Sequence, residues 1–479
     1  MSAETMARPP LDKEVLSRLE EIFGKDRVLT NQTDLITYSY DASFETQLNP
    51  RKPEVVVIAL STEEVSECVK LANEFMVPIY PRGAATGQTG GAVSTKGGIM
   101  MDLSKMNRIL DIDHRNMQVI IEPGVIQNDL NEALKPYGLR FPPDPGSANM
   151  CTVGGMVSNN SSGLRAVKYG VTRHYVLGME VVLPTGEVIV TGGAKSKALK
   201  SVSGYDLAHL MIGSEGTLGI VTRLRLKLLP LPVTRGIVLC SFKQLEDAGA
   251  AVNAVFSSGL QPSAIEIMDF NCTKAVNMMK PELNLPIDNE AILVFEVDGA
   301  KEEVSSQVNR LKQVVEKYAS HIQFSDEPEE CEKLWQARKL VGAAVGLLKP
   351  GGFRVYGGED ICVPISRLPE TLREIHNIAD RYEIVCGIYG HVGDGNLHTG
   401  PVVNSNNEVE MENVQQMIDE IHDLAIKMEG TTTAEHGVGI VRAQYMDIEH
   451  GPAMEVMRAI KRTLDPNNIL NPGKMALPN

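Results

Sequence analysis

Short apolar runs alternate with amphipathic stretches along the front half of the chain. The run PEVVVIAL (53–60) is apolar and rich in β-branched residues, which predicts a buried strand. Ser61 stands three residues before Glu64, the spacing of a capping box, and apolar residues then recur at helical spacing. A second strand is predicted at VPIY (77–80), which leads into the glycine-rich PRGAATGQTGG (81–91). The pattern predicts a strand–helix–strand unit with a loop at its exit whose backbone N–H groups can approach a phosphate.

The same alternation continues further along the chain. YVLGMEVVLPTGEVIV (175–190) predicts a β-hairpin with its turn at Thr185–Gly186. AILVFEVDG (291–299), followed by KEEVSSQVNRLKQVVEKYA (301–319), predicts a strand and then a helix. The proline-spaced LLPLP (228–232) is a candidate domain boundary. Because 479 residues are too many for one compact core, we expect two or more domains.

Composition and charge exclude several classes of protein. The net charge of −15 argues against nucleic acid as a main partner, because phosphate binding needs a basic surface. The beginning of the chain is predicted to be an amphipathic helix without a signal core, and the apolar LVGAAVGLL (340–348) is too short to span a bilayer. We therefore expect a cytoplasmic protein without a transmembrane segment, able to lie at a membrane only through a partner. The scattered cysteines predict free thiols and no iron–sulfur cluster: Cys68, Cys151, Cys240, Cys272, Cys331, Cys362 and Cys386.

Four glycine-rich loops in the front half share Gly, Ser, Thr and Asn. They are PRGAATGQTGG (81–91), PPDPGS (142–147), TVGGMVSNNSSGLRAVKYG (152–170) and GSEGTLGIVT (213–222). No GK[ST] of a P-loop and no intact GxGxxG occurs, so neither a P-loop nor a Rossmann NAD site is supported. One such loop would usually be only a turn. Four loops rich in backbone and hydroxyl donors suit an extended ligand that contains a diphosphate.

These loops, in this order, resemble the FAD-binding domain of the vanillyl-alcohol-oxidase and p-cresol-methylhydroxylase superfamily. The resemblance covers roughly residues 50–230 and implies FAD as cofactor. Some members attach flavin through a histidine four residues after the loop arginine; here that position is Thr86, so the flavin is expected to be non-covalent. The implied FAD contacts are Pro81, Arg82, Gly83, Ala84, Ala85, Thr86, Gly87, Gln88, Pro143, Asp144, Gly146, Ser147, Thr152, Gly155, Asn159, Ser161, Gly163, Glu215, Gly216, Ile220 and Asn471.

The back half carries GIYGHVGDGNLHTG (387–400), with two histidines among closely spaced glycines. His391 and His398 are seven residues apart, which puts them on opposite faces of an ideal strand, and the glycines disfavour a helix. The segment must fold back on itself for both rings to converge. Two imidazoles can bind a divalent transition ion if a third ligand joins them, and TTTAEHGVG (431–439) offers Glu435. From the residues alone, a metal site and a purely structural histidine pair remain equally open.

The motifs GHVGDGNLH, EHGVG and LDPNNILNPGK (464–474) resemble the C-terminal domain of FAD-linked oxidases. That group includes D-lactate dehydrogenases, glycolate oxidase catalytic subunits and D-2-hydroxyglutarate dehydrogenases, and DICVPISRLPE (360–370) is most similar to the cytochrome-linked D-lactate dehydrogenases. The resemblance implies that His391, His398 and Glu435 bind a divalent metal, with zinc expected and manganese or iron(II) as alternatives. It also implies His436 as catalytic base and Arg338, in LWQARK (334–339), as the residue that holds the substrate carboxylate. An ordinary surface salt bridge is the alternative for Arg338.

The resemblance implies an α+β protein of two domains. An FAD-binding domain of the vanillyl-alcohol-oxidase and p-cresol-methylhydroxylase type is expected over residues 1–230, with its core at about 50–230. A substrate (cap) domain with an antiparallel sheet follows over 231–479, and its last segment, about 455–479, returns to the FAD domain.

Two departures from the dicarboxylate enzymes of this group bear on the substrate. Some D-2-hydroxyglutarate dehydrogenases have a threonine four residues after the arginine, where this chain has Gly342, and a lysine further on, whereas VYGGE (355–359) has none. A short monocarboxylate such as D-lactate or glycolate is therefore favoured over D-2-hydroxyglutarate.

The expected reaction passes the Cα hydride to flavin N5 and leaves a 2-oxo acid. Electrons would then pass to an external acceptor: an electron-transfer flavoprotein, a cytochrome, an iron–sulfur subunit or a quinone. Two other classes stay open, a metal-dependent hydrolase, which leaves the four loops unexplained, and a non-catalytic flavin electron-transfer subunit, which has no use for Arg338 and His436.

Overall fold

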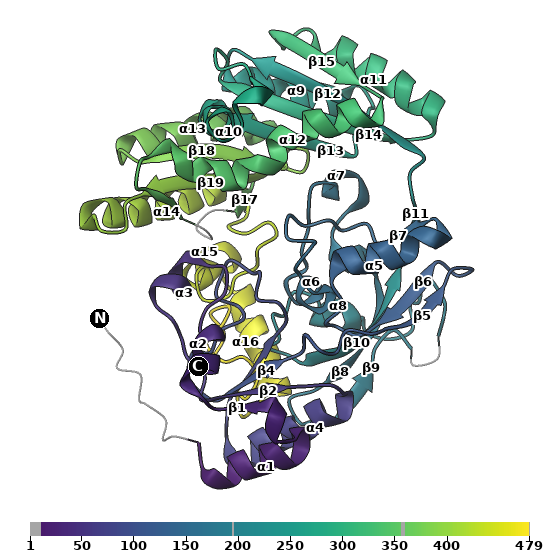
Figure 1. Ribbon diagram of the computed structural model, residues 1–479, viewed down its shortest axis with the longest axis vertical. Coiled ribbons are helices and arrows are strands. Elements are labelled where there is room, and N and C mark those ends of the chain that lie inside the picture. Colours follow the sequence, from purple (N-terminus) through teal and green to yellow (C-terminus); the bar gives the residue numbers. More distant parts are fainter. Residues whose placement is uncertain (1–10, 194–195, 356–359, 479) are drawn as a thin grey trace. The chain divides into compact units, whose positions relative to one another are not determined.

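The computed structural model describes residues 11–193, 196–355 and 360–478, and the chain divides into two compact units. The first unit is made of Met1–Ser162, Val171–Leu231 and Glu435–Asn479, and the second of Gly163–Gly170 and Pro232–Ala434. Figure 1 shows the elements of both, and each unit is described here by itself. Within the described ranges, no helix is both long enough and apolar enough to cross a membrane.

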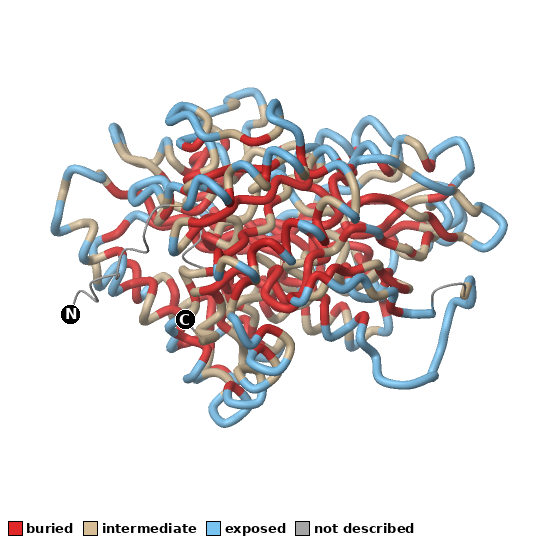
Figure 2. The backbone as a smooth tube through the Cα atoms, turned by 90° about the horizontal axis from the view of Figure 1, so that it is seen from below, coloured by how far each residue is buried: buried red, intermediate tan, exposed pale blue. Residues whose placement is uncertain are grey.

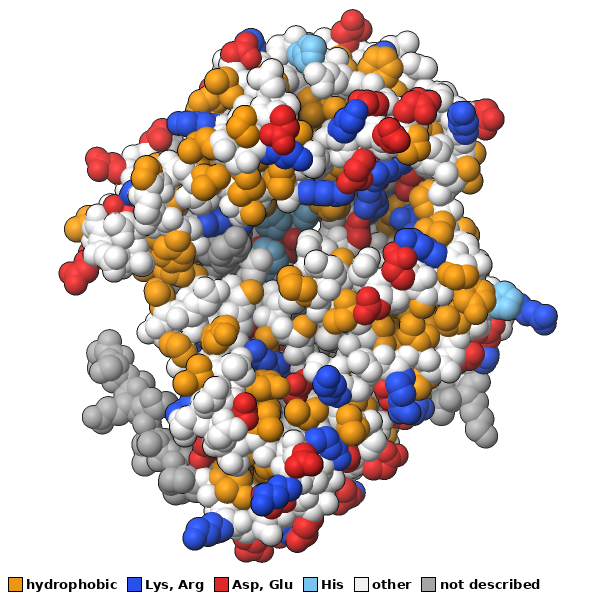
Figure 3. All heavy atoms as spheres, in the orientation of Figure 1, with side chains coloured by type: hydrophobic (Ala, Val, Ile, Leu, Met, Phe, Trp, Pro, Cys, Tyr) orange, Lys and Arg blue, Asp and Glu red, His pale blue; other side chains and the backbone are white. Residues whose placement is uncertain are grey.

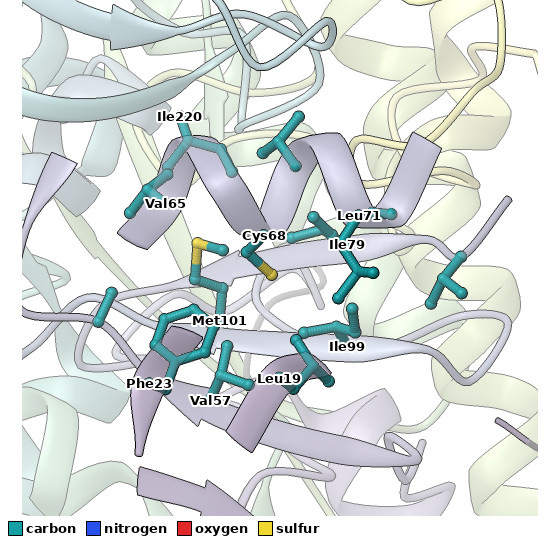
Figure 4. Packing of buried hydrophobic residues seen from close by; sticks show 14 of the residues in the cluster. Leu19, Phe23, Val57, Val65, Cys68, Leu71, Ile79, Ile99, Met101 and Ile220 are labelled. Carbon is teal, nitrogen blue, oxygen red and sulfur yellow. The ribbon is translucent and has the colours of Figure 1, made fainter. Parts of the chain in front are cut away.

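The first unit contains a small mixed sheet with strands in the order β1–β2–β4–β3. The pairs β2–β4 and β3–β4 are parallel, and β1 pairs antiparallel with β2. Two helices pack on it, and their apolar side chains form one core with those of the strands (Figure 4). The elements are α1 (Lys13–Phe23), β1 (Val28–Leu29), β2 (Val55–Ile58), α4 (Thr62–Phe75), β3 (Ile79–Arg82) and β4 (Ile99–Asp102).

The strand–helix–strand unit predicted from the sequence is confirmed, with two local differences. Strand β3 begins at Ile79 rather than Val77 and continues to Arg82, where the glycine-rich loop starts. Ser61 caps α4 by accepting a bond from Glu64 N at 3.3 Å. In a complete capping box, the Glu64 carboxylate would accept from Ser61 N. Here Glu64 Oε2 accepts from Leu60 N at 2.8 Å instead.

A second sheet of the first unit is antiparallel, in the order β5–β6–β10–β8–β9. The predicted hairpin is confirmed as β8 and β9, and Gly186 takes a φ of 83° in its turn. The elements of this part are β5 (Ile109–Asp113), β6 (Gln118–Ile121), α5 (Gln127–Leu134), α6 (Val153–Asn159), β8 (Val176–Val182), β9 (Val188–Val190), α8 (Leu207–Met211) and β10 (Ile220–Lys227).

The C-terminal segment of the chain belongs to the first unit. After α16 (Ala453–Leu464), the chain pairs with the edge of β3, where Ile79 N donates to Ile469 O and Asn471 N donates to Ile79 O, both at 2.8 Å. Lys474 is fully buried, and its Nζ donates to the carbonyls of Gly90 and Val93 at 2.5 and 2.8 Å. These bonds fasten the segment around Lys474 to the glycine-rich loop and to the residues just after it.

Burial of Lys474 predicts a stability that rises with pH. Removal from water lowers the pKa of this amine to about 7, whereas an unfolded lysine has a pKa of about 10.4. Between these values the unfolded chain binds the extra proton, so the free energy of unfolding is expected to increase from pH 7 to pH 9.5. Denaturant titrations at both pH values check this. In Lys474→Met the increase should be smaller than in the wild type, and an equal increase would contradict the assignment.

The second unit contains a larger antiparallel sheet, in the order β15–β12–β14–β13–β18–β19–β16, with β17 also paired to β19. The predicted strand and helix at 291–299 and 301–319 are confirmed as β14 and α11, although α11 ends at Val315. The strands are β12 (Thr234–Phe242), β13 (Ala264–Asp269), β14 (Ala291–Gly299), β15 (His321–Ser325), β16 (Phe353–Arg354), β17 (Asp360–Cys362), β18 (Val385–Gly390) and β19 (Asn396–Val403). The longer helices are α9 (Leu245–Ser257), α10 (Phe270–Met279), α11 (Lys301–Val315), α12 (Pro328–Ala344), α13 (Leu368–Arg381) and α14 (Glu408–Lys427).

Burial follows this sheet closely. Every residue of β13 and β19 is buried, whereas loops and outer helical turns carry the exposed residues (Figure 2). Polar groups inside this region therefore need partners within the protein, because water does not reach them. On the face shown in Figure 3, basic and acidic side chains are interspersed, in keeping with a chain of net charge −15.

A short segment of the front half, Gly163–Gly170, is part of the second unit. Arg165 forms a two-pronged ion pair with Glu296 at 2.7 and 2.8 Å, and Lys168 contacts Asp298 at 2.5 Å. Glu296 and Asp298 are two residues apart on β14, so their side chains leave the same face of the strand. These paired charges hold the segment on the sheet.

Candidate active site

The stretch 387–400 folds into a hairpin of β18 and β19, which is the turn back that convergence of its two histidines required. At the turn, Asp394 N and Asn396 N both donate to His391 O at 3.2 Å. Gly395 has a φ of 90°, and a Cβ there would lie 2.0 Å from Val363 O, so this position requires glycine. The hairpin brings the rings of His391 and His398 together, with their centroids 5.1 Å apart and their planes at 89°.

Each of these histidines turns its Nδ1 atom toward a buried carboxylate. His391 Nδ1 lies 2.6 Å from Glu266 Oε1, and His398 Nδ1 lies 3.5 Å from Asp360 Oδ1. Glu266 and Asp360 are both fully buried. At His391 the 2.6 Å contact favours the tautomer with its proton on Nδ1, which makes Nε2 the lone-pair atom of the ring. Histidines that bind metals are typically oriented in this way.

Asp360 also fixes the chain that leads to Glu435. Its Oδ2 accepts from Ala434 N at 3.1 Å and from Thr433 Oγ1 at 3.2 Å, and its Oδ1 accepts from Asn396 Nδ2 at 2.8 Å. Ala434 is the last residue of the second unit before the chain passes into the first. Asp360 therefore holds Ala434, the residue that directly precedes Glu435 in the chain.

Arg338 lies in α12, with its side chain 9% exposed. Its Nη2 lies 2.7 Å from Glu266 Oε2, and its guanidinium carbon lies 5.1 Å from the centre of the Tyr389 ring. The alternative of an ordinary surface salt bridge is therefore wrong. A buried guanidinium offers planar, paired donors that suit a carboxylate.

A second buried arginine, Arg354 on β16, lies against the same tyrosine. Its guanidinium carbon is 5.1 Å from the centre of the Tyr389 ring, its Nη2 is bonded to the Tyr389 hydroxyl, and its Nη1 donates to Gly342 O at 3.0 Å. A Cβ at Gly342 would lie 3.3 Å from Arg354 Nη1. The position at which some dicarboxylate enzymes have threonine is thus packed against Arg354. Residues 356–359 of VYGGE lie outside the described residues.

In the first unit, the loop that carries His436 is fixed through its backbone. Glu215 accepts from Val438 N at 2.6 Å and from Gly439 N at 2.8 Å. The His436 carbonyl accepts from Thr89 Oγ1 and from Asn159 Nδ2, both at 3.3 Å. Burial raises the pKa of Glu215, while the two N–H bonds act in the opposite direction.

The His436 imidazole takes no part in these backbone bonds. It is 21% exposed, and its Nε2 lies 3.7 Å from Glu435 Oε1. The backbone is therefore held by several bonds while the imidazole keeps access to a ligand. Glu215 and Asn159, predicted as flavin contacts, also position this loop, and their role toward flavin stays a prediction.

The first unit brings three of the four predicted flavin loops together. A Cβ at Gly83 would lie 2.3 Å from Thr152 Oγ1, and one at Gly216 would lie 2.5 Å from Pro81 Cγ. Asn471 Nδ2 donates to Glu215 O at 2.6 Å. The glycines at these crossings leave room for the side chains of Thr152 and Pro81 from neighbouring loops. Glycine also allows a ligand to approach the backbone closely, which suits a phosphate-containing ligand.

Other predicted flavin residues, among them Arg82 and Pro143, make contacts within the protein. Arg82 uses its Nη1 to bond Tyr40 O and Ala92 O, both at 3.0 Å, so its guanidinium braces the protein itself. The loop at 142–147 is tied to α5, where Gln127 Nε2 donates to Pro143 O at 2.7 Å. Gly163 falls in the segment that belongs to the second unit.

Sequence reasoning missed Glu266, Asp360, Arg354 and Tyr389. The signal for Glu266 was present, because a lone glutamate inside AIEIM, in an apolar strand, indicates a buried and partnered charge. Asp360 and Arg354 carry no comparable signal, since their partners come from strands far away in the sequence.

Comparison with known proteins shows the family of the chain. The family described as FAD linked oxidases, C-terminal domain, matches residues 231–475, and the FAD binding domain family matches residues 53–192. The chain therefore belongs to the FAD-linked oxidases, and it is a flavin-dependent oxidoreductase.

Relatives and a solved structure make the placement more specific. The chain is 38% identical to glycolate oxidase subunit GlcD of Bacillus subtilis, over 97% of each chain. It is 37% identical to the mitochondrial D-lactate dehydrogenase [cytochrome] of Arabidopsis thaliana, over 97% of this chain and 80% of that one. A structure of p-cresol methylhydroxylase with substrate bound superposes with a TM-score of 0.78 at 19% identity, covering 97% of this chain and 96% of that chain. The predicted α+β fold of the vanillyl-alcohol-oxidase and p-cresol-methylhydroxylase type is confirmed.

Proposed function

We propose that the protein oxidises a small D-2-hydroxy acid, D-lactate or glycolate, to the 2-oxo acid with non-covalent FAD as the primary acceptor. The observation that carries the proposal is the arrangement in the second unit. There, two histidines backed by carboxylates lie next to Arg338, a buried arginine suited to a substrate carboxylate. The relatives named D-lactate dehydrogenase and glycolate oxidase subunit support the substrate class.

The residues present fit a divalent metal, with zinc expected. His391 and His398 would provide their Nε2 atoms, because their Nδ1 atoms face Glu266 and Asp360, and Glu435 would provide the third ligand. Manganese and iron(II) accept the same ligands. We prefer a metal that serves a D-lactate dehydrogenase type of reaction to one that serves a hydrolase, because the family of the chain uses flavin.

Bound FAD supplies the hydride acceptor at N5, and a bound divalent metal supplies a Lewis acid that lowers the pKa of the substrate hydroxyl. Arg338 binds the substrate carboxylate and fixes its orientation. His436 accepts the hydroxyl proton at a ring nitrogen, a task that suits an imidazole near neutral pH. Its backbone bonds to Thr89 and Asn159 hold the loop that carries the imidazole.

A second candidate is oxidation of D-2-hydroxyglutarate, and Arg354 is the observation that favours it. A buried guanidinium beside Tyr389 is a second cation near Arg338, in a chain that lacks the threonine and lysine of some dicarboxylate enzymes.

The reduced flavin needs an external acceptor in either case, for which we propose an electron-transfer flavoprotein, a cytochrome, an iron–sulfur subunit or a quinone.

Flavin bleaching tests the proposal directly. The purified protein should be yellow, and its flavin absorbance should be lost on anaerobic addition of D-lactate or glycolate. A panel with L-lactate and D-2-hydroxyglutarate separates the substrates, because only the preferred acid should bleach the flavin quickly. A yellow protein that no 2-hydroxy acid bleaches would contradict the proposal and favour an electron-transfer subunit.

A further inference from the structure

Glu266 occupies a central position in the second unit that the proposed reaction does not explain. It lies on β13, fully buried, between two groups with different tasks. One carboxylate oxygen, Oε1, is 2.6 Å from His391 Nδ1, and the other, Oε2, is 2.7 Å from Arg338 Nη2. The two partners come from β18–β19 and from α12, so only the tertiary fold joins them.

We propose that Glu266 is a positioning residue that couples the metal site to the substrate carboxylate site. This inference rests on the proposed function and names how its two binding groups are kept in register. One oxygen of this carboxylate bonds to the imidazole and the other forms an ion pair with the guanidinium, so its position bears on both groups. Displacement of either partner therefore moves the carboxylate away from the geometry that the other one needs.

Physical chemistry explains why one carboxylate is used for both tasks. A buried guanidinium needs a counter-charge, because burying an unpaired ion is expensive. A metal-binding imidazole becomes a better ligand when its other nitrogen donates to a carboxylate. Glu266 meets both needs with one negative charge, and the remaining N–H donors of Arg338 can still face a substrate.

Replacement of Glu266 by glutamine tests whether one side chain serves both His391 and Arg338. The amide keeps one acceptor oxygen, so it can serve His391 or Arg338 but not both, and it has no charge. In Glu266→Gln we expect Zn²⁺ affinity, measured by competition with a chromophoric chelator, to fall by about 10-fold to 100-fold. We also expect KM for the acid that bleaches the flavin fastest to rise by at least 10-fold, measured with a dye as acceptor.

The decisive measurement is KM at saturating Zn²⁺. If Glu266 couples the sites, KM stays raised when every molecule carries metal, while kcat and the flavin spectrum change much less. Recovery of the wild-type KM at saturating Zn²⁺ would overturn the inference, because Glu266 would then support only His391. Unchanged Zn²⁺ affinity would overturn it as well.

Two further variants make the test independent of folding. Glu296→Gln is the matched control: it removes a charge from another buried, arginine-paired glutamate of the same sheet, and should leave Zn²⁺ affinity and KM unchanged. If Glu266→Gln does not fold, Glu266→Asp keeps the charge but is one methylene too short for both partners. It should weaken both properties together, and loss of only one would contradict the coupling.

Failure of this inference can be told apart from failure of the proposed function. A wild-type protein that binds no Zn²⁺ and whose flavin no 2-hydroxy acid reduces contradicts the proposed function itself. A wild-type protein that does both, next to a Glu266→Gln variant with normal Zn²⁺ affinity and KM, contradicts only the role of Glu266.

Discussion

His436→Ala is expected to lower kcat by about 10²-fold to 10⁴-fold while the protein stays yellow. The imidazole is the group that we assign to proton removal, so its loss leaves the hydroxyl proton without an acceptor. The loop itself should remain in place. Glu215 holds the N–H groups of Val438 and Gly439, and Thr89 and Asn159 hold the His436 carbonyl, and none of these bonds uses the imidazole.

The measurement is steady-state turnover together with the ratio of FAD to protein. His209→Ala is a suitable control, because His209 is an exposed histidine of the same unit that pairs with Asp206 and has no role in the proposed reaction. We expect its turnover and flavin content to equal those of the wild type. A His436→Ala protein that turns over within a few-fold of the wild type would exclude His436 as the base.

Elements with strong local patterns could be predicted from the sequence. The apolar run at 291–299 is β14 at the predicted bounds, and the amphipathic stretch after it is α11. The sequence also showed that His391 and His398 could converge only if the segment folded back on itself, a turn that its glycines permit and that the structure contains. In these cases the determining residues are neighbours in the chain.

The exact ends of the helices and strands were less predictable than their presence. Strand β3 is displaced by two residues toward the glycine-rich loop, because its pairing with β4 and with the C-terminal segment sets where it begins. The capping box at Ser61 is incomplete because the Glu64 carboxylate accepts from Leu60 N and also pairs with the distant Arg27 at 2.7 Å. Long-range partners decided both details, and they leave no local signal.

The supporting residues of the site could not be predicted for the same reason. Glu266 reaches His391 because β13 pairs with β18, and Asp360 reaches His398 because β17 pairs with β19. Antiparallel pairing between strands more than 30 residues apart depends on the whole sheet. The two histidines that we propose as metal ligands were therefore visible in the sequence, whereas the carboxylates beside them were visible only in the fold.

Removal of the metal is expected to abolish most turnover and to leave the flavin bound. Stabilisation of the developing alkoxide by a divalent ion is worth several kcal/mol, so dialysis against a chelator should lower kcat by on the order of 10³-fold. Added Zn²⁺ or Mn²⁺ should restore it. His398→Ala should show the same loss without recovery, because the ring that Asp360 orients is gone.

The control for His398→Ala is His422→Ala, which removes another buried histidine of the second unit. His422 Nδ1 is 2.8 Å from the Ile418 carbonyl inside α14, so its loss costs stability without touching the proposed ligands. Metal content, measured by elemental analysis, should fall in His398→Ala and stay normal in His422→Ala. Full turnover by a metal-free wild-type protein would contradict the metal site, and His391 and His398 would then be a structural pair held by Glu266 and Asp360.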